Sequence, residues 1–495
     1  MVQTAPKEHH LSTLPLVGVI DVGSNSIRLV IFEDDVRSPD YFFNEKTICR
    51  LGEGLSATGK LNPRGKERAM SALRRFVGIA NGMGVRELIG VGTAAMREAD
   101  DAPAFRDEVA RETGLEIRVA TGLEEARLSS CGVMLGWPNA EGLIADIGGS
   151  SLELAKVEGG ELMGAVSTKA GHLRLADATA DERSNTLTQL RREASRFVPV
   201  KGPLVLIGGA WRALAKAEMS RRKYPLHVLM GYEVEPDDIR ELCDWATSVD
   251  PQQLKKAANA SSSRVASIAA GAQALKCLMD TLEPENVAIS AFGLREGLIF
   301  DRMTKAQRGE DPLLAAAAAM EGRSARSPGF GREVFEWLAP IIDRFPIDQQ
   351  RLALATCHLH DVNWRQHPDF RAASCFATVT RANLSGLGHG GRIFIGAALL
   401  HRYKTTDLGA DVSASLKLLS DDKRKSAEAL GRALRLGAML TGSVKGMLNK
   451  TRIEITNGEL ALIFEPGVAH LAGERVQRRL TALGDCLGLK ARMIA

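Results

Sequence analysis

The sequence lacks long hydrophobic runs and contains few aromatic residues. Its longest apolar runs, residues 313–320 and 393–400, are eight residues each, whereas a membrane-spanning helix needs about 20. Only 5% of the residues are aromatic, so platforms for stacking nucleic-acid bases are scarce and we expect no nucleic-acid partner. The first residues also lack a basic segment followed by an apolar one. We therefore expect no secretory signal, no membrane association and a cytoplasmic location.

Closely spaced cysteine pairs are also absent. The seven cysteines are scattered, their number is odd, and no CxxC pair occurs. This pattern favours reduced thiols and argues against a structural zinc site. What is present is ordinary for a globular protein: 45% hydrophobic and 25% charged residues. A length of 495 residues suggests about three domains.

Charge is unevenly distributed along the chain. The net charge is +4, but residues 306–495 carry 26 basic and 19 acidic residues, a net charge of +7. Residues 1–305 therefore carry a net charge of −3. A basic C-terminal part can attract a polyanion, and a solvated, solubilising surface is an equally good interpretation of the charge alone.

The first 300 residues contain an internal repeat. Residues 17–33 and 142–157 both read as strand, glycine turn and strand, and they share the pattern D-[VI]-G-x-x-S-[IL]-x-L with an offset of 125 residues. Helical and strand patterns alternate around both copies, which predicts two similar α/β domains. Residues 313–495 are mostly helical by period, with a hairpin around TNGE. We expect a disordered segment at 1–15, domains at 16–140 and 141–305, and a helical, basic region at 306–495.

The two glycine hairpins suit a phosphate site. Glycines let backbone N–H groups approach an anion, and the serine and asparagine side chains add donors. The carboxylates of Asp21, Asp146 and Glu153 would repel a phosphate unless a cation lay between them. Mg²⁺, which binds through one or two carboxylates together with phosphate oxygens, is the expected cation.

Six motifs in this order, IDVGSNSIRLV, VGTAAMREAD, TGLEEAR, IADIGGSSLEL, IGGAWRALAKAE and SAFGLREG, make the sequence resemble the exopolyphosphatase and guanosine pentaphosphate phosphohydrolase family. The resemblance spans residues 19–297. It implies two ribonuclease-H-like domains of the actin, sugar kinase and Hsp70 superfamily around a cleft. It further implies a mainly α-helical C-terminal region related to HD domains, and a homodimer.

The resemblance also implies roles for individual residues. Glu125 matches the family's catalytic glutamate, which orients or deprotonates the attacking water, and its neighbour Glu124 is the fallback. Asp146 and Glu153 match the Mg²⁺ ligands, and Asp21 is a weaker candidate ligand. The phosphate-binding positions are Gly23, Ser24, Asn25, Ser26, Arg97, Gly148, Gly149, Ser150, Ser151, Gly208 and Gly209.

The C-terminal region offers two further sites. His360 and Asp361 form the His-Asp dipeptide of HD domains, but the preceding helix supplies no histidine for the usual first ligand. We prefer a metal-free, structural HD-like fold, and a second phosphohydrolase centre at His360, Asp361 and His389 is the alternative. The basic residues Arg432, Arg435, Lys445 and Lys450 are candidates for a track that retains a long polyphosphate, although solvated helix faces explain them equally well.

The expected function is Mg²⁺-dependent removal of the terminal phosphate of inorganic polyphosphate. A monovalent cation such as K⁺ is an open addition. Guanosine pentaphosphate (pppGpp) 5′-phosphohydrolysis is the first alternative, because it would use the same residues. A polyphosphate- or nucleotide-sensing module with slow turnover is the second.

Overall fold

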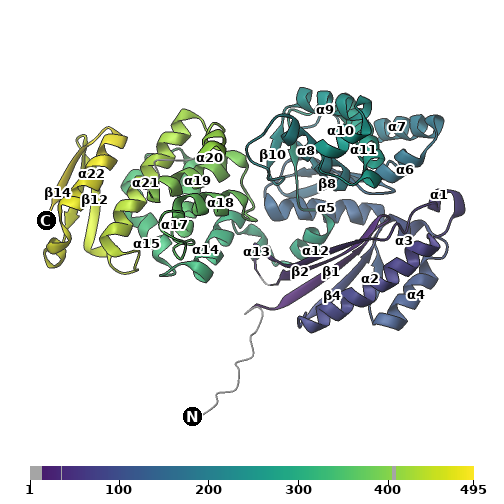
Figure 1. Ribbon diagram of the computed structural model, residues 1–495, viewed down its shortest axis with the longest axis horizontal. Helices are drawn as coiled ribbons and strands as arrows, with labels where there is room; N and C mark the ends of the chain where they lie inside the picture. The colour runs from purple at the N-terminus through teal and green to yellow at the C-terminus, as the bar shows by residue number, and fades with distance from the viewer. Residues whose placement is uncertain (1–13, 35, 404–408) are drawn as a thin grey trace, which may run out of the picture. The chain divides into compact units, whose positions relative to one another are not determined.

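The computed structural model describes residues 14–34, 36–403 and 409–495. The chain forms two compact units. The first comprises the residues up to Tyr224 together with Leu229–Glu310, and the second comprises Pro225–Val228 and Asp311–Ala495. Most of the segment expected to be disordered, residues 1–13, lies outside the described residues. The first unit contains two α/β lobes, each built on its own sheet (Figure 1).

The sheet of lobe I has the strand order β3-β2-β1-β4-β5. Its first three strands are antiparallel neighbours, and β4 and β5 run parallel to β1. Figure 1 shows α2 and α4 together on one side of this sheet. The elements are β1 (Leu16–Val22), β2 (Ser26–Glu33), β3 (Tyr41–Ile48), α1 (Leu55–Thr58), α2 (Pro63–Gly82), β4 (Glu87–Gly92), α3 (Ala94–Glu98), α4 (Ala102–Thr113) and β5 (Ile117–Val119).

The sheet of lobe II has the order β10-β11-β9-β6-β7-β8, again with an antiparallel hairpin beside parallel strands. Its strands are β6 (Gly142–Ile147), β7 (Leu152–Glu158), β8 (Glu161–Thr168), β9 (Leu204–Ile207), β10 (Tyr232–Val234) and β11 (Val287–Ile289). Its helices are α6 (His172–Asp177), α7 (Ala180–Ala194), α8 (Gly209–Arg221), α9 (Pro236–Ser248), α10 (Pro251–Ala257) and α11 (Val265–Leu282).

Strand alternation explains where the charged residues point. Ile20 and Val22 of β1 belong to the hydrophobic core of lobe I, so Asp21, between them, faces the opposite side of the sheet. In lobe II, Ala145 and Ile147 lie in the core, and Asp146 faces away from it in the same manner. The alternating hydrophobic pattern of each strand therefore places one aspartate of each hairpin outside the core.

Helices α5 (Gly122–Gly136) and α12 (Leu294–Arg302) pack against each other. Two glycines allow this close approach. A Cβ atom on Gly297 would lie 1.7 Å from the Leu128 carbonyl oxygen, and one on Gly132 would lie 2.2 Å from that of Gly293. Helix α5 also contacts β7 and β8, which fixes its N-terminal residues beside the second hairpin.

The second unit is mainly helical. The expected hairpin is present as β12 and β13, joined by Asn457 and Gly458, both with positive φ. The elements are α14 (Pro312–Ser324), α15 (Phe330–Trp337), α16 (Ala339–Ile342), α17 (Ile347–Leu359), α18 (Arg371–Arg381), α19 (His389–Tyr403), α20 (Gly409–Leu416), α21 (Asp421–Thr441), β12 (Thr451–Thr456), β13 (Glu459–Phe464), α22 (Glu474–Leu487) and β14 (Lys490–Ile494).

Two local details differ from a simple interpretation of the sequence. The segment after lobe II contains a short helix, α13 (Lys305–Gly309), started by a capping box in which Thr304 and Gln307 exchange hydrogen bonds. Strand β5 is only three residues long, because Thr121 already caps α5. Among the described residues, no helix has the length and apolar character needed to cross a membrane.

Candidate active site

Equivalent turns close the two glycine hairpins. The Gly23 N–H donates to the Ser26 carbonyl oxygen at 3.1 Å, and the Gly148 N–H donates to that of Ser151 at 2.9 Å. The tips of the turns meet, because the hydroxyl oxygens of Ser24 and Ser150 are 3.0 Å apart and both residues are buried. The structure therefore brings together the two phosphate loops predicted from the repeat.

Cross-strand register places charges of opposite sign in the two lobes. In lobe I, Asp21 pairs with Arg28, and Arg28 pairs in turn with Lys46. In lobe II, Asp146 pairs with Glu153, and Glu153 accepts a hydrogen bond from the Ser167 hydroxyl at 2.9 Å. Cross-strand partners point to the same face. Lobe I thus presents two cations beside its aspartate, and lobe II presents a second carboxylate.

Glu125 lies in the first turn of α5 and is buried. Its carboxylate accepts a hydrogen bond from the Arg97 guanidinium, which also donates to the Ala120 carbonyl oxygen at 2.7 Å. Burial raises the pKa of Glu125, the Arg97 charge opposes that rise, and the negative charges of Asp146 and Asp21 add to it. Arg97, expected at the phosphates, therefore also holds the candidate catalytic carboxylate in place.

The fallback residue, Glu124, has a different environment. Its carboxylate pairs with Arg118 near the protein surface, and its N–H donates to the Thr121 hydroxyl, which caps the helix. The pKa of Glu125, by contrast, responds to burial, to the Arg97 charge and to the charges of Asp146 and Asp21.

The carboxylates of this region are electrostatically linked. Burial raises the pKa values of Asp21, Asp146 and Glu153, and the charges of Glu125 and Asp146 raise that of Glu153 further. Ser129 donates a hydrogen bond to Asp146, whereas the Arg295 guanidinium lies 3.3 Å from Asp21. Such a concentration of negative charge fits a divalent cation, and Asp21 fits less well because an arginine already faces it.

The number of ligands that the protein can supply is small. In the described part of the chain, no three carboxylate, imidazole or thiolate side chains lie close enough to hold a metal ion on their own. Mg²⁺ differs from zinc in this respect, because it commonly takes one or two protein carboxylates and completes its shell with phosphate oxygens and water. The adjacent pair Asp146 and Glu153 fits that requirement.

A strongly basic cavity of about 420 Å³ is lined by residues of β2, β3, α8 and α12, among others. Hydrogen bonds hold three arginines in it. Arg28 donates to the Asn44 side chain. Arg212 donates to the Ala291 carbonyl oxygen, and Arg264 donates to that of Gly209. Desolvation and the fields of nearby arginines lower the pKa of Lys46 to about 8. Glu296 is the one acidic residue among the described residues that line it. The six basic lining residues are Arg28, Lys46, Arg212, Lys216, Arg264 and Arg295.

The third glycine motif borders this cavity. Gly208 has a φ of 112°, and a Cβ atom there would lie 2.4 Å from the Ile147 carbonyl oxygen, so only glycine fits without strain. Gly209 begins α8 and lines the basic cavity. The motif thus serves to bring Arg212 and Lys216, one turn apart on α8, to the cavity wall.

In the second unit, the His-Asp dipeptide is tied to protein groups. Asp361 forms a bidentate ion pair with Arg326, with both N–O distances 2.7 Å. The buried His360 shares a hydrogen bond of 2.7 Å between its Nδ1 and the Cys357 carbonyl oxygen, and burial lowers its pKa to about 4. His389 Nε2 lies 2.8 Å from the Val228 carbonyl oxygen. Each of the three side chains thus has a protein partner, while the buried His360 Nε2 itself has none in the described part of the chain. Among the described residues, these side chains are not gathered closely enough to hold a metal ion.

The predicted polyphosphate track is only partly assembled. Arg432 is paired with Glu428 at 2.6 Å. Burial and the charges of Arg479, Arg402 and Arg432 lower the pKa of Arg435 to about 10, which marks a local group of arginines. Lys445 and Lys450 are exposed in the segment that follows α21.

The cations of the basic cavity were not predicted from the sequence. Arg28 was the detectable one, because the repeat offset of 125 places it on Glu153 and so reverses the charge at equivalent positions. Lys46 and Arg264 have no comparable signal, because β3 and the start of α11 come together with α8 only in the folded chain.

Comparisons with known proteins agree with this architecture. Residues 30–306 match the Ppx/GppA phosphatase family, and residues 313–494 match the C-terminal domain of exopolyphosphatases. Exopolyphosphatase 1 of Mycobacterium tuberculosis is 28% identical over 310 residues, which cover 58% of this chain and 88% of that protein. The corresponding protein of Mycobacterium leprae is 29% identical over 311 residues, covering 58% and 89%.

Solved structures show the same fold. The Ppx/GppA family member of Aquifex aeolicus has a TM-score of 0.52 at 24% identity and covers 60% of this chain and 99% of its own. An exopolyphosphatase from Cytophaga hutchinsonii has a TM-score of 0.53 at 22% identity, covering 58% and 99%. The architecture is therefore mixed α/β with actin-like sheets and a helical C-terminal region. Because the family match covers more than half of the sequence, the chain belongs to the Ppx/GppA phosphatase family and is a hydrolase.

Proposed function

We propose that this hydrolase is an exopolyphosphatase, which removes the terminal phosphate from inorganic polyphosphate. The observation that carries the proposal is the basic cavity next to the carboxylates of the hairpins. Arg28 and Lys46 are cross-strand neighbours of like charge, an arrangement that destabilises a sheet unless an anion compensates for it. A chain of phosphates, with a negative charge at each unit, supplies that compensation.

The terminal phosphate would lie between the glycine turns. Backbone N–H groups of the turns and the hydroxyls of Ser26 and Ser151 can donate to its oxygens. The remainder of the chain would occupy the basic cavity. Arg295 links the two regions, since its guanidinium lines the cavity and lies 3.3 Å from Asp21.

Asp146 and Glu153 would hold a Mg²⁺ ion. When bound, the ion neutralises charge on the phosphate oxygens, as is general in phosphoryl transfer. The protein keeps these ligands oriented through hydroxyl donors: Ser129 hydrogen-bonds to Asp146, and Ser167 to Glu153. These supporting contacts fix the carboxylates before the substrate arrives.

Glu125 would act on the attacking water. Burial raises its pKa, which makes the carboxylate a stronger proton acceptor than an exposed glutamate. Arg97 fixes its direction through one hydrogen bond and is itself anchored to the Ala120 carbonyl oxygen. Positioning of water matters here because phosphoryl transfer requires little covalent chemistry from the protein.

The same residues could serve pppGpp, but the basic cavity favours an inorganic chain. Tyr41 is the one aromatic residue among the described residues that line it. Its ring already packs against Phe32 and Phe292, and its hydroxyl donates to Glu296 at 3.0 Å. A guanine base would therefore find no open aromatic surface there, whereas phosphate groups find six cations. The arginines around Arg435 on the second unit are a further, weaker proposed contact for a long chain.

Phosphate release tests the proposal. Long-chain polyphosphate and pppGpp are compared as substrates at equal phosphate concentration, with Mg²⁺ and with a chelator. We expect faster release from polyphosphate, dependent on Mg²⁺. A clear preference for pppGpp would move the protein to the nucleotide alternative, and tight polyphosphate binding without release would favour the sensing module.

A further inference from the structure

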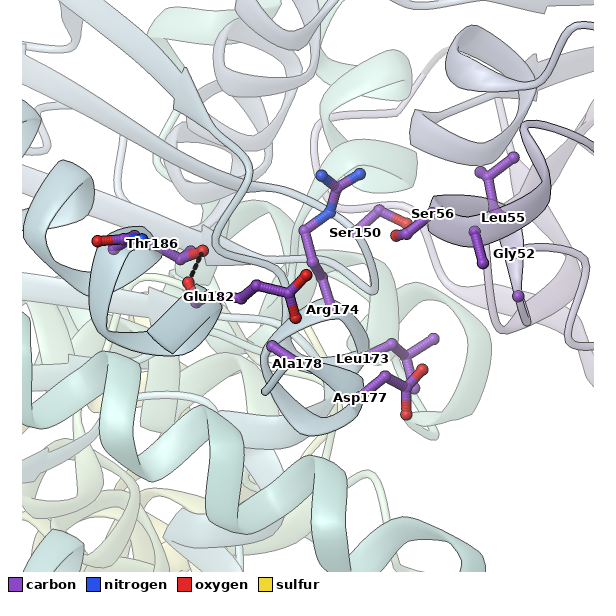
Figure 2. Close-up of a pocket in the computed structure, with 13 residues that line it drawn as sticks. Gly52, Leu55, Ser56, Ser150, Leu173, Arg174, Asp177, Ala178, Glu182 and Thr186 are labelled. Atoms are coloured by element: carbon purple, nitrogen blue, oxygen red, sulfur yellow. Dashed lines mark hydrogen bonds between the residues drawn. The ribbon is translucent and has the colours of Figure 1, made fainter. Parts of the chain in front are cut away.

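A second cavity, of about 570 Å³, lies at the tips of the glycine hairpins (Figure 2). Lobe I contributes residues 52 and 54–57, and lobe II contributes Ser150 and residues of α6 and α7. Gly52 is fixed to the first hairpin, because its N–H donates to the Ser24 carbonyl oxygen at 2.8 Å. In the described part of the chain, the residues that line this tip cavity and those that line the basic cavity do not overlap.

The two cavities are linked to the carboxylate cluster through different residues. The basic cavity reaches Asp21 through Arg295. The tip cavity is lined by Arg174, which pairs with Glu98 at 2.6 Å. Glu98 follows Arg97, the residue that holds Glu125. The tip cavity is therefore connected, through the ion pair of Arg174 with Glu98, to α3, the helix whose Arg97 holds Glu125.

In phosphoryl transfer, the attacking and leaving oxygens lie roughly in line on opposite sides of the phosphorus. The water is at Glu125, and the leaving chain is in the basic cavity. The new orthophosphate therefore forms on the Glu125 side, away from the basic cavity. While the shortened chain stays bound, it blocks the basic cavity as a way out.

The charge of the tip cavity suits passage of a small anion and not retention of a chain. Among the described residues that line it, Arg174 is the one basic residue, and it is already paired with Glu98. Asp177 and Glu182 also line it, and their charges repel a polyanion. Arg174, Ser56, Ser150, Asn185 and Thr186 line the cavity together (Figure 2), so an orthophosphate would meet one guanidinium and several hydroxyl and amide groups on its way out.

The contact between Ser24 and Ser150 joins the tips of the two hairpins at the tip cavity. It is a single hydrogen bond between neutral hydroxyls, 3.0 Å long. Such bonds contribute modestly to stability and exchange readily with water or phosphate as partners. A departing phosphate can therefore displace this hydrogen bond and pass between the two serines.

We propose that the tip cavity is the exit route for orthophosphate, separate from the basic cavity that retains the chain. This inference rests on the proposed exopolyphosphatase function. It explains how phosphates can be removed one after another without release of the chain, because product and chain leave the catalytic centre in different directions.

Blocking the tip cavity tests the proposal. Ala57→Trp and Ala178→Trp place indoles in it from the two lobes, and both positions have solvent exposure that permits the larger side chain. Ala104→Trp, on the exposed surface of α4 and lining neither cavity, is the matched control. Rapid quenching measures phosphate formed, and a fluorescent phosphate-binding protein measures phosphate released.

The blocked variants should form their first phosphate at the wild-type rate and then slow at least about fivefold, giving a burst in quenched samples that the release signal lacks. Because only a step after chemistry slows, kcat/KM should stay unchanged while kcat and KM fall together. Wild-type kinetics in both variants, or a lower kcat/KM without a burst, would overturn the exit route. Absence of phosphate formation by the wild type would overturn the proposed function and this inference with it.

Discussion

Arg28 and Glu153 occupy equivalent positions in the two lobes and carry opposite charges. Each is the cross-strand partner of the hairpin aspartate, Asp21 in lobe I and Asp146 in lobe II. The two copies of the hairpin thus differ in the charge beside the aspartate. One copy gathers carboxylates that suit a cation, and the other gathers cations that suit a phosphate chain. This division explains how an acidic and a basic region lie side by side in one site.

Charge reversal in the basic cavity should weaken polyphosphate binding. Lys46→Glu and Lys216→Glu change residues of the cavity wall that reach solvent, so the fold should be retained. We expect KM for long chains to rise about tenfold or more, with a shallower salt dependence, because fewer phosphates are neutralised.

Arg432→Glu and Arg435→Glu provide the comparison on the second unit. Arg432 is already paired with Glu428, so we expect a smaller effect on KM than in the cavity. A larger effect from the C-terminal pair, measured in the same assay, would make the arginines of α21 the principal chain contact.

Mg²⁺ should stabilise the protein through Asp146 and Glu153. Their pKa values are raised in the fold, so without a cation their ionised forms cost stability as pH rises above the usual carboxyl range. Asp146→Asn should raise the Tm of the metal-free protein by about 2–4 °C and abolish the further rise on adding Mg²⁺. Scanning calorimetry with Mg²⁺ and with a chelator measures both effects. An undiminished response to Mg²⁺ in Asp146→Asn and Glu153→Gln would place the cation elsewhere.

Arg97 should set the acid limb of the pH–rate profile. Its charge lowers the pKa of Glu125 against the effect of burial. In Arg97→Ala the carboxylate would take up its proton at a higher pH, moving the acid limb of kcat upward by about one to three pH units. Arg118→Ala, which removes the partner of Glu124, is the control and should leave the limb in place. A shift in the control alone would implicate Glu124 instead.

His360 should make the protein sensitive to acid. Burial lowers its folded-state pKa to about 4 from an ordinary value of 6.5. The unfolded chain therefore binds the extra proton first, and stability present above pH 6.5 is lost as pH falls toward 4, by about 3 kcal/mol. His360→Phe should flatten this part of the stability curve in urea unfolding followed at several pH values. His367→Phe, at an exposed position, should keep the wild-type slope, and an unchanged slope in His360→Phe would contradict the prediction.

The sequence predicts the local elements of this protein better than the contacts between elements that are distant in the sequence. The repeat around Asp21 and Asp146 predicts both hairpins, because strand alternation and glycine turns are local properties. The Arg97–Glu125 contact was not predicted, since it depends on how α3 and α5 pack. The basic cavity was not predicted for the same reason, as its cations come from β2, β3, α8, α12 and the turn before α11. In the second unit, the dipeptide at His360 is local, but Arg326, which pairs with Asp361, lies 35 residues away.

The most direct test of the account is the turnover of long-chain polyphosphate by Glu125→Gln and by Glu124→Gln. The substitution at Glu125 preserves size but removes the proton acceptor, so kcat should fall about 10²–10⁴-fold with KM nearly unchanged. Glu124→Gln, at the partly exposed neighbour, should stay within about threefold of the wild type. Wild-type turnover by Glu125→Gln, or a large loss confined to Glu124→Gln, would contradict the assignment of Glu125 as the residue that directs the water.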